Sequence, residues 1–414
     1  MRILILTQWF PPEPQKLLLE LAVTLKELGH KVTVLTGLPN WPTGKIYSGY
    51  RFRLWQKEEM DGITVIRVPL YPDHSRNGVR RALNYFSFSF AAAVLGPFVV
   101  PPVDVVHVIH PPITMGLAAW TISRLRGVPF TYEIQDMWPE TLAATGMVRQ
   151  VWALRLVGWF AQWVYARSGG IRVISPGFRE NLIAKKVPAE KIHVISNWVD
   201  PNFYIPAPKN EELRGKLGFS NKFVVMYAGT IGPAQEIETL VEAAALLGDL
   251  PDILFAIFGD GMERELLTAK AATRGLNNVH FYGHRPAVEM PAIYALSDVL
   301  LIHLKDDPLF RITIPHKTFV YMAVAKPILA AVEGDVADVV VATGAGITCR
   351  PSQPRLLADA VRRLRTTPRE ALAQMGLRGR AAAETTFERK TLVAQVALLL
   401  RDAIRAAGGD KIGP

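Results

Sequence analysis

The sequence has 414 residues, a formal net charge of +10 and one cysteine. Half of its residues are hydrophobic and 20% are charged, which is typical of a globular protein, and the length is sufficient for two domains. The single cysteine, Cys349, excludes an internal disulfide framework and is typical of a reducing compartment.

The positive charge is concentrated in the first half of the chain. Residues 1–200 contain 22 Lys and Arg against 14 Asp and Glu, whereas residues 201–414 contain 25 against 23. A basic half of this kind is suited to nucleic acid, an anionic membrane or a phosphorylated substrate. The chain has no zinc-finger spacing, no aromatic-basic RNA signature and no helix-turn-helix pattern, so we expect no nucleic-acid partner.

Short apolar runs alternate with longer helical patterns, which predicts an α/β fold with parallel sheets. Strands are expected in the first half at residues 3–6, 31–36, 64–69, 105–109, 130–134 and 171–175, and in the second half at 223–228, 253–258, 279–282, 299–303, 327–331 and 346–348. The two sets predict two doubly wound, Rossmann-like domains, at residues 1–200 and 208–385. A proline-rich stretch near 198–210 is expected to be the linker. The N-terminus is interpreted as the first buried strand and not as a signal peptide.

Two helical patterns in the first half are apolar on more than one side. Residues 82–103 lack any charge, and Pro97 is expected to end their helix after about 15 residues, or roughly 22 Å, too short to span a bilayer. The helix expected at 149–167 aligns Trp152, Trp159 and Trp163 on one line, with another apolar face opposite. Two interpretations stay open: an interfacial membrane contact, or two buried helices of a large domain.

Polar side chains follow the expected strands of the first half. Glu13, Gln15 and Lys16 come after the first strand, His110 follows the strand at 105–109, and Asp136 follows the strand at 130–134. A lone histidine at a strand end is often structural. Beside a carboxylate on a neighbouring strand end, it becomes a candidate for a functional site.

Glycine turns follow three expected strands of the second half: Gly229 to Gly232, Gly259-Asp260-Gly261, and Gly283-His284. Glycines between a strand and a helix let the backbone approach a phosphate. Each turn alone is a weak signal. Since the carboxyl ends of parallel strands share one sheet edge, together they predict a nucleotide-diphosphate site.

A fourth loop follows the strand at 299–303 and contains Arg311. Pro315 is expected to open a helix through about Ala323, with Lys317 in its first turn. A cation there opposes the helix dipole, which makes sense if an anion such as a diphosphate lies between Lys317, Arg311 and the free N–H groups. The alternative is two solvated cations beside a loop. Asp306 and Asp307 lack a third ligand, so we expect no metal site.

These segments together resemble the retaining glycosyltransferases of family 4, which have the two-domain GT-B architecture. The similarity runs nearly end to end and is carried by LTGLPNWPTGKIYSGY (35–50), HPPITMGLAA (110–119), QDMWPETL (135–142), ISPGFRENLIAKKVPAEKIHVISNWVD (174–200), YAGTIGPAQEIETLVEAA (227–244), FGDG (258–261) and DDPLFRITIPHKTFVYMAVAKPIL (306–329). The branch it resembles most builds bacterial O-antigen and capsule units and includes N-acetyl-fucosamine-type transferases.

The resemblance implies two domains facing a cleft, with a UDP-sugar on the second half, an acceptor over the first, and a C-terminal helix at about 388–410 crossing back to the first domain. The base is implied near Gly283 and His284, and the phosphates between the Gly229 turn and Arg311 and Lys317. Further donor-binding residues are expected at Lys16, Gln235, Gly259, Asp260, Gly261 and Thr318.

Three features depart from the family pattern. A frequent glycine pair in the first loop is replaced by Glu13-Pro14-Gln15-Lys16, and a frequent Arg and Lys by Thr230 and Gln235. The family's two glutamates align with Ile312 and Val320. Donor binding is therefore expected to depend on Arg311, Lys317 and helix N-termini.

The expected activity is metal-independent transfer of a sugar, an N-acetylated hexosamine or deoxyhexosamine, with retention of configuration. Arg311 and Lys317 would stabilise the leaving diphosphate, His110 would position the donor sugar or polarise the site, and Asp136 would orient the acceptor. The acceptor is expected to be a saccharide on a polyprenyl diphosphate, with the protein cytoplasmic and peripheral on the inner face of the plasma membrane. The alternatives are a UDP-sugar epimerase and a non-catalytic nucleotide-sugar-binding protein.

Overall fold

The computed structural model describes residues 1–75 and 77–408. The chain divides into two compact units. The first unit contains Met1–Ser196 together with the segment that begins at Arg389, and the second unit contains Asn197–Glu388.

The first unit is built on an eight-stranded sheet of order β3-β4-β2-β1-β5-β6-β7-β8, in which only β3 is antiparallel to its neighbour. Its strands are β1 (Arg2–Leu6), β2 (Lys31–Gly37), β3 (Gln56–Met60), β4 (Ile63–Val68), β5 (Val105–His110), β6 (Phe130–Ile134), β7 (Gly170–Val173) and β8 (Ile192–Val194). Its helices are α1 (Lys16–Glu27), α2 (Gly78–Val99), α3 (Met115–Arg126), α4 (Glu140–Ala144), α5 (Val151–Arg167), α6 (Pro176–Ala184), the 3₁₀ turn η1 (Ala189–Lys191) and α16 (Arg389–Ala406).

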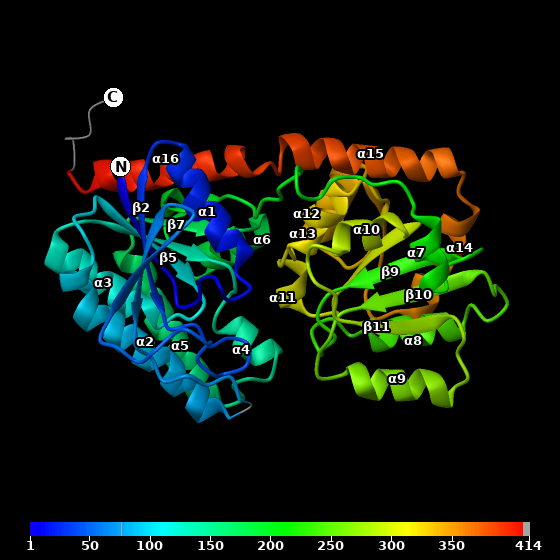
Figure 1. The fold of residues 1–414 in the computed structure, drawn as a ribbon, viewed down its shortest axis with the longest axis horizontal. Helices are drawn as coiled ribbons and strands as arrows, with labels where there is room; N and C mark the ends of the chain where they lie inside the picture. Colours follow the sequence, from blue (N-terminus) through cyan, green and yellow to red (C-terminus); the bar gives the residue numbers. More distant parts are fainter. Residues whose placement is uncertain (76, 409–414) are drawn as a thin grey trace. The chain divides into compact units, whose positions relative to one another are not determined.

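Helices cover both faces of this sheet. α16 packs against α1 and against β5, β6 and β7, whereas α2, α3 and α5 form a neighbouring row on the other face (Figure 1). Apolar residues dominate the buried strands because both faces are covered; β5, for example, is buried along its whole length.

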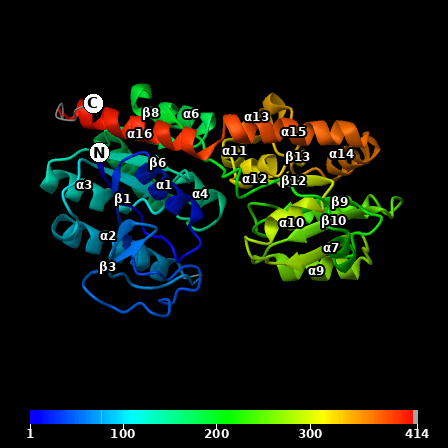
Figure 2. The ribbon, with the colours of Figure 1, turned by 45° about the horizontal axis from the view of Figure 1, so that its top comes forward.

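The second unit has a six-stranded parallel sheet of order β11-β10-β9-β12-β13-β14. Its strands are β9 (Phe223–Ala228), β10 (Ile253–Phe258), β11 (Val279–Gly283), β12 (Val299–His303), β13 (Ile328–Ala331) and β14 (Gly346–Cys349). Its helices are α7 (Glu211–Lys216), α8 (Glu238–Ala245), α9 (Arg264–Thr273), α10 (Met290–Ala295), α11 (Pro308–Arg311), α12 (Lys317–Ala323), α13 (Asp335–Thr343), α14 (Pro354–Thr366) and α15 (Arg369–Thr385), several of which can be followed in Figure 2.

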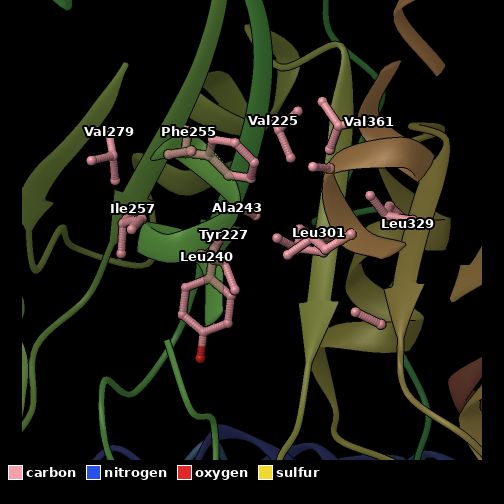
Figure 3. Packing of buried hydrophobic residues seen from close by; sticks show 14 of the residues in the cluster. Val225, Tyr227, Leu240, Ala243, Phe255, Ile257, Val279, Leu301, Leu329 and Val361 are labelled. Atoms are coloured by element: carbon pink, nitrogen blue, oxygen red, sulfur yellow. The ribbon is translucent and has the colours of Figure 1, made fainter. Parts of the chain in front are cut away.

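The core of the second unit is a cluster of aliphatic and aromatic side chains from the sheet and from α8 and α14. Figure 3 shows Val225, Phe255 and Leu301 projecting into it from three strands, with Leu240 of α8 and Val361 of α14. Tyr227 lies at the edge of this cluster, with its hydroxyl pointing away from the aliphatic side chains.

The predicted fold class is confirmed, since both units are doubly wound α/β domains, and each of the twelve predicted strands overlaps an observed one. Two strands were not predicted. β3 carries the charged sequence QKEEM on the sheet edge, and β8 has only three residues, so neither has an apolar pattern long enough to detect.

The prediction that Pro97 ends its helix is wrong. α2 continues to Val99, and the N–H of Val100 still donates to the carbonyl of Gly96 at 3.1 Å. Proline lacks the N–H of its own hydrogen bond, and its ring clashes with the turn that precedes it. Neither effect acts on the residues after the proline, so they can remain helical. At 22 residues α2 is about 33 Å long, and the expectation that it is too short to cross a membrane is also wrong.

Two smaller corrections concern the segment with the two cations. Arg311 lies in the short helix α11 and not in an open loop, because Asp307 caps this helix through the N–H of Leu309 at 2.9 Å. The following helix α12 begins at Lys317 and not at Pro315, so Lys317 is its first residue.

Candidate functional site

The second unit has its strand-order reversal between β9 and β12. Open parallel sheets bind ligands at the carboxyl ends of the strands that flank such a reversal. Gly229 follows β9, and His303 is the last residue of β12. The candidate donor site of this unit is therefore the edge where these two residues lie.

Lys317 reaches this edge from the first turn of α12. Its Nζ lies 3.9 Å from the centroid of the Tyr227 ring, and a side chain at Gly229 would place its Cβ only 2.4 Å from that Nζ. Burial lowers the pKa of the Lys317 ammonium to about 7. No carboxylate among residues 1–75 and 77–408 pairs with it, so a cation is held at the strand ends without a counterion.

Two side chains at this edge were missed by the sequence analysis, Tyr227 and His303. The Tyr227 ring lies against the Lys317 ammonium, and its hydroxyl donates to the carbonyl of Thr230 at 2.7 Å. His303 is buried, and its Nδ1 lies 2.8 Å from the carbonyl of Gln235, which assigns the proton to Nδ1. Its Nε2 has no partner among the described residues. Both residues belong to apolar strand patterns, so their spacing carried no signal of function.

The predicted glycine turns interlock at the same edge. A Cβ on Gly259 would lie 1.8 Å from the carbonyl oxygen of Gly229, and one on Gly261 would lie 2.2 Å from that of Ile231. Gly259 and Gly261 have φ values of +130° and +157°. These two glycines are thus required by the contact between loops, which is a packing reason in addition to the predicted approach to a phosphate.

Arg311 differs from Lys317 because it is already ion-paired. Its guanidinium lies 2.9 Å from Asp306 and 3.2 Å from Glu333, and its side chain is half exposed. These carboxylates raise the pKa of Arg311, so its guanidinium is permanently charged. An anion that binds Arg311 would have to compete with Asp306 and Glu333 for it.

The other predicted donor-binding residues lie around these loops. His284 is exposed directly after β11, and the Asp260 carboxylate pairs with Arg264 at 3.6 Å. Gly283 has a φ of +71° at the end of β11. Thr318 is fully buried, and no partner for its hydroxyl is found among the described residues.

The first unit has its own reversal between β1 and β5, and His110 is the last residue of β5. β5 pairs with β6 so that His110 lies opposite Ile134, and Asp136 follows two residues later. His110 and Asp136 therefore stand at adjacent strand ends, as the sequence analysis supposed.

Burial changes the chemistry of both groups. It lowers the pKa of His110 to about 3, so the imidazole is neutral, and the ring lies edge-on to Trp138 with centroids 5.2 Å apart. Neither ring nitrogen has a partner among residues 1–75 and 77–408. Burial raises the pKa of the Asp136 carboxyl. A neutral imidazole suits hydrogen bonding to a neutral ligand group better than it suits binding a phosphate.

The loop Glu13-Pro14-Gln15-Lys16, which follows β1, is organised by Glu13. Its carboxylate accepts the N–H groups of Phe10, Asn40 and Trp41 at 3.0, 2.8 and 2.8 Å. Burial outweighs these donors and raises the pKa of Glu13 to about 7. Lys16, the first residue of α1, lies 3.5 Å from Glu20 and half exposed.

No group of three or more His, Cys, Asp or Glu side chains that could hold a metal ion occurs in the described parts of the chain. A cavity of about 570 Å³ lies at the opposite, amino-terminal edge of the first unit's sheet, lined by Arg2, Asp104 and Arg126 among others. Arg2 and Asp104 pair with each other there at 2.6 Å. This cavity contains none of the predicted site residues.

Two family models match the chain, one on each half. The model of the glycosyl transferase 4-like domain matches residues 14–198, and the model of glycosyl transferases group 1 matches residues 209–382.

Named relatives are similar over part of the chain. A colanic acid biosynthesis glycosyl transferase of Escherichia coli, WcaI, is 28% identical over 68% of this chain and 71% of its own length. The glycosyltransferase WbjE of Pseudomonas aeruginosa is 26% identical over 57% of this chain and 59% of its own.

Solved structures share the fold at lower identity. HepE of Anabaena in complex with UDP superposes with a TM-score of 0.73 at 19% identity, covering 97% of this chain and 100% of its own. Sucrose-phosphate synthase of Thermosynechococcus elongatus superposes with a TM-score of 0.74 at 16% identity, covering 98% and 100%.

Proposed function

Since the chain belongs to the two-domain GT-B glycosyltransferases, we propose that it transfers a sugar from a UDP-sugar to a hydroxyl of a saccharide acceptor. We infer that the reaction retains the anomeric configuration and needs no metal ion.

The observation that carries the donor assignment is Lys317. It is a partly buried cation with no carboxylate partner among the described residues, at the strand-order reversal of the second unit. An anion at this edge would find the ammonium, the backbone of the Gly229 turn and the first turn of α12 together. The HepE structures contain UDP and UDP-glucose, which supports a uridine diphosphate as that anion here.

The chemistry follows from the charge that develops. The bond between the anomeric carbon and the diphosphate oxygen breaks, the acceptor hydroxyl oxygen bonds to that carbon, and its proton passes to the leaving diphosphate. Fixed positive charge from Lys317 and Arg311 stabilises the diphosphate most strongly where water is excluded. Since the leaving group takes the proton on the same face, no pair of flanking carboxylates has to be present.

The first unit would supply the acceptor side. His110, neutral and buried, would donate one hydrogen bond to a sugar hydroxyl, and Asp136 would orient the acceptor. The donor sugar is proposed to be an N-acetylated hexosamine or deoxyhexosamine, and the acceptor a lipid-linked saccharide of a bacterial surface polysaccharide. The name of the E. coli relative, which assigns it to colanic acid biosynthesis, supports this acceptor class.

The test is an incubation of the purified chain with a panel of UDP-sugars, with and without a polyprenyl-diphosphate-linked saccharide. We expect UDP release and a lengthened saccharide for one donor, only when the acceptor is present. Conversion of a UDP-sugar without acceptor would indicate an epimerase, and UDP binding without turnover of any donor would indicate a nucleotide-sugar-binding protein. Either result would overturn the proposed transfer.

A further inference from the structure

Three helices that cover one face of the first unit's sheet contain no carboxylate. α2, α3 and α5 lie together on this face (Figure 1), and α3 packs against both α2 and α5. None has an Asp or Glu at any position, and their charged residues are all arginines: Arg80, Arg81, Arg124, Arg126, Arg155 and Arg167. On the other face of the sheet, α1 and α16 carry both signs of charge.

The outward side of the same row is apolar. Phe98 is 82% exposed, and Trp152 and Trp159 are 69% and 65% exposed. The exposed apolar residues on α2 recur every three or four positions, which places them along one side of the helix: Val79, Leu83, Phe86, Phe90, Val94 and Phe98. A shorter line on α5 consists of Val151, Trp152, Leu156 and Trp159. We call these residues together with Arg80, Arg81, Arg124, Arg155 and Arg167 the α2–α5 surface. Arg126 does not belong to it, because this side chain lines the cavity at the amino-terminal edge and donates to the carbonyl of Val100.

This surface is in addition to the core-facing sides of the same helices. Phe88, Ala92 and Gly96 of α2, and Ala161 and Val164 of α5, are already buried in the first unit. Large contiguous apolar areas on a soluble protein indicate a binding surface. Each helix thus has one side in the core and another outside it, so neither is fully buried.

Charge and side-chain type favour one occupant. A surface with arginines and no carboxylate over three helices attracts an anionic partner. Exposed Trp and Phe beside Arg are the combination found where helices lie in the headgroup region of a bilayer. The cytoplasmic leaflet carries anionic lipids, which complement this surface.

α2 is long and apolar enough to cross a membrane, but its inner side is bonded into the first unit. Asn84 accepts from Gln8 at 2.6 Å and donates to the carbonyl of Tyr71 at 2.6 Å, and the Ser89 hydroxyl donates to the carbonyl of Thr114 at 2.5 Å. Crossing would break these bonds and expose the sheet beneath. A helix held in this way is not free to cross a membrane, whereas its outward side can lie against one.

We propose that the first unit docks peripherally on an anionic lipid bilayer through the α2–α5 surface, with the aromatic side chains among the headgroups and the arginines on lipid phosphates. This rests on the proposed function only in that a lipid-linked acceptor would be presented there; the surface itself is defined independently of any reaction.

The test is flotation of the full chain with vesicles of phosphatidylcholine containing about 30% phosphatidylglycerol, and with phosphatidylcholine alone. We expect at least about tenfold tighter binding to the anionic vesicles, lost when the salt is raised so that surface charges are screened. The variant Trp152→Ser/Trp159→Ser should bind at least about tenfold more weakly, since two interfacial aromatic side chains are removed. Arg155→Glu should weaken binding to the anionic vesicles only.

A matched control is Leu28→Ser/Leu398→Ser, which removes two exposed leucines on the other face, one at the C-cap of α1 and one in α16, and should bind vesicles like the wild type. UDP affinity should be equal in all these variants, which separates docking from donor binding. The thermal unfolding of the full chain should also be unchanged, which shows that the first unit is folded. Loss of transfer with vesicle binding intact would refute the proposed function alone. No flotation of the wild type at low salt, or self-association abolished by the tryptophan variant, would overturn docking; the second result would indicate a second copy as the occupant.

Discussion

Lys317 is the residue whose charge state is most sensitive to its surroundings. Its pKa of about 7 means that the ammonium is present below pH 7 and is lost as the pH rises above it. A bound diphosphate favours the charged form, so binding above pH 7 requires uptake of a proton. UDP affinity should therefore fall as the pH is raised from 6 to 9, by up to about tenfold per unit above the pKa.

The measurement is calorimetric titration of UDP at several pH values. Lys317→Arg keeps a positive charge that does not titrate in this range. The pH dependence of UDP binding by this variant therefore reflects only the titration of UDP itself. Lys317→Ala should bind weakly at every pH and turn over about 10²–10³-fold more slowly. Equal pH slopes for the wild type and Lys317→Arg would contradict the assigned role.

Arg311 contributes in a different way, because its charge is permanent and shared with two carboxylates. Its ion pairs are half exposed, where such pairs stabilise a fold little. Arg311→Ala should keep the wild-type Tm and lower kcat/KM for the donor by at least about tenfold. Arg350→Ala is the control, since Arg350 also approaches Glu333, at 3.5 Å, and is more exposed. If both variants behave alike in steady-state kinetics, Arg311 does not contact the diphosphate.

Tyr227 should act through Lys317 and not on the substrate. The Lys317 ammonium lies over the Tyr227 ring, which stabilises the charged form of the lysine. The Tyr227 hydroxyl donates to the carbonyl of Thr230 and holds it in place. Tyr227→Phe keeps the ring, so the pH midpoint of UDP binding should not move. Tyr227→Leu removes the ring and should shift that midpoint to lower pH. A purely structural role would lower the affinity of both variants without moving the midpoint.

At the scale of elements, the interlocked glycine loops make another prediction. The Cβ of Gly259→Ala would overlap the carbonyl of Gly229, at a φ that side chains rarely adopt. Overpacking costs about 1–3 kcal/mol and the backbone strain adds about 1–3 more, so thermal unfolding should detect it. UDP affinity should fall too, since the Gly229 turn must move. The Cβ of Gly248→Ala would make only an ordinary van der Waals contact, with the carbonyl oxygen of Ala245 at 3.8 Å, so this variant should change neither property.

The elements that the sequence predicted well are those with long apolar or periodic patterns. Buried strands such as β9 and β12 were found because parallel strands covered on both faces are continuously apolar. β3, β8 and α11 were missed because their form depends on pairing with β4, on pairing with β7 and on the Asp307 cap, respectively. The end of α2 was predicted wrongly because the rule that a proline ends a helix considers only the local sequence. Gly96 and Pro97 are buried in the first unit, and this packing holds the end of the helix.

At the scale of the whole molecule, the predicted site has two kinds of residue. Lys317 and the glycine turns were recognisable because their chemistry is unusual for their local structure. Tyr227 and His303 were not, since their roles arise only when β9, β12 and α12 meet at one edge. Sequence patterns indicate the local environment of a residue. Neighbours that are brought together by the strand order can be identified only when the topology of the sheet is known.

One unit is built from a single segment of the chain and the other from two segments, and the consequence for folding can be tested. The second unit is one continuous segment, Asn197–Glu388, whereas the first requires α16 from the end of the chain. Eight residues of α16 are buried: Leu392, Val393, Val396, Ala397, Leu399, Leu400, Ala403 and Ile404. Burying a large aliphatic side chain contributes about 1.5–3 kcal/mol. The free energy lost with α16 is therefore comparable to the whole stability of a domain, which is about 5–15 kcal/mol.

Fragment 1–196 should therefore aggregate or remain unfolded by circular dichroism, and joining residues 389–408 to it through a flexible linker should restore a cooperative transition. Fragment 197–388 should fold alone and bind UDP with the pH dependence set by Lys317, because its sheet, its core and its donor edge all come from within the segment. A folded fragment 1–196 would show that α16 covers the first unit without stabilising it. A folded fragment 197–388 that does not bind UDP would show that groups outside this unit are needed to hold the donor.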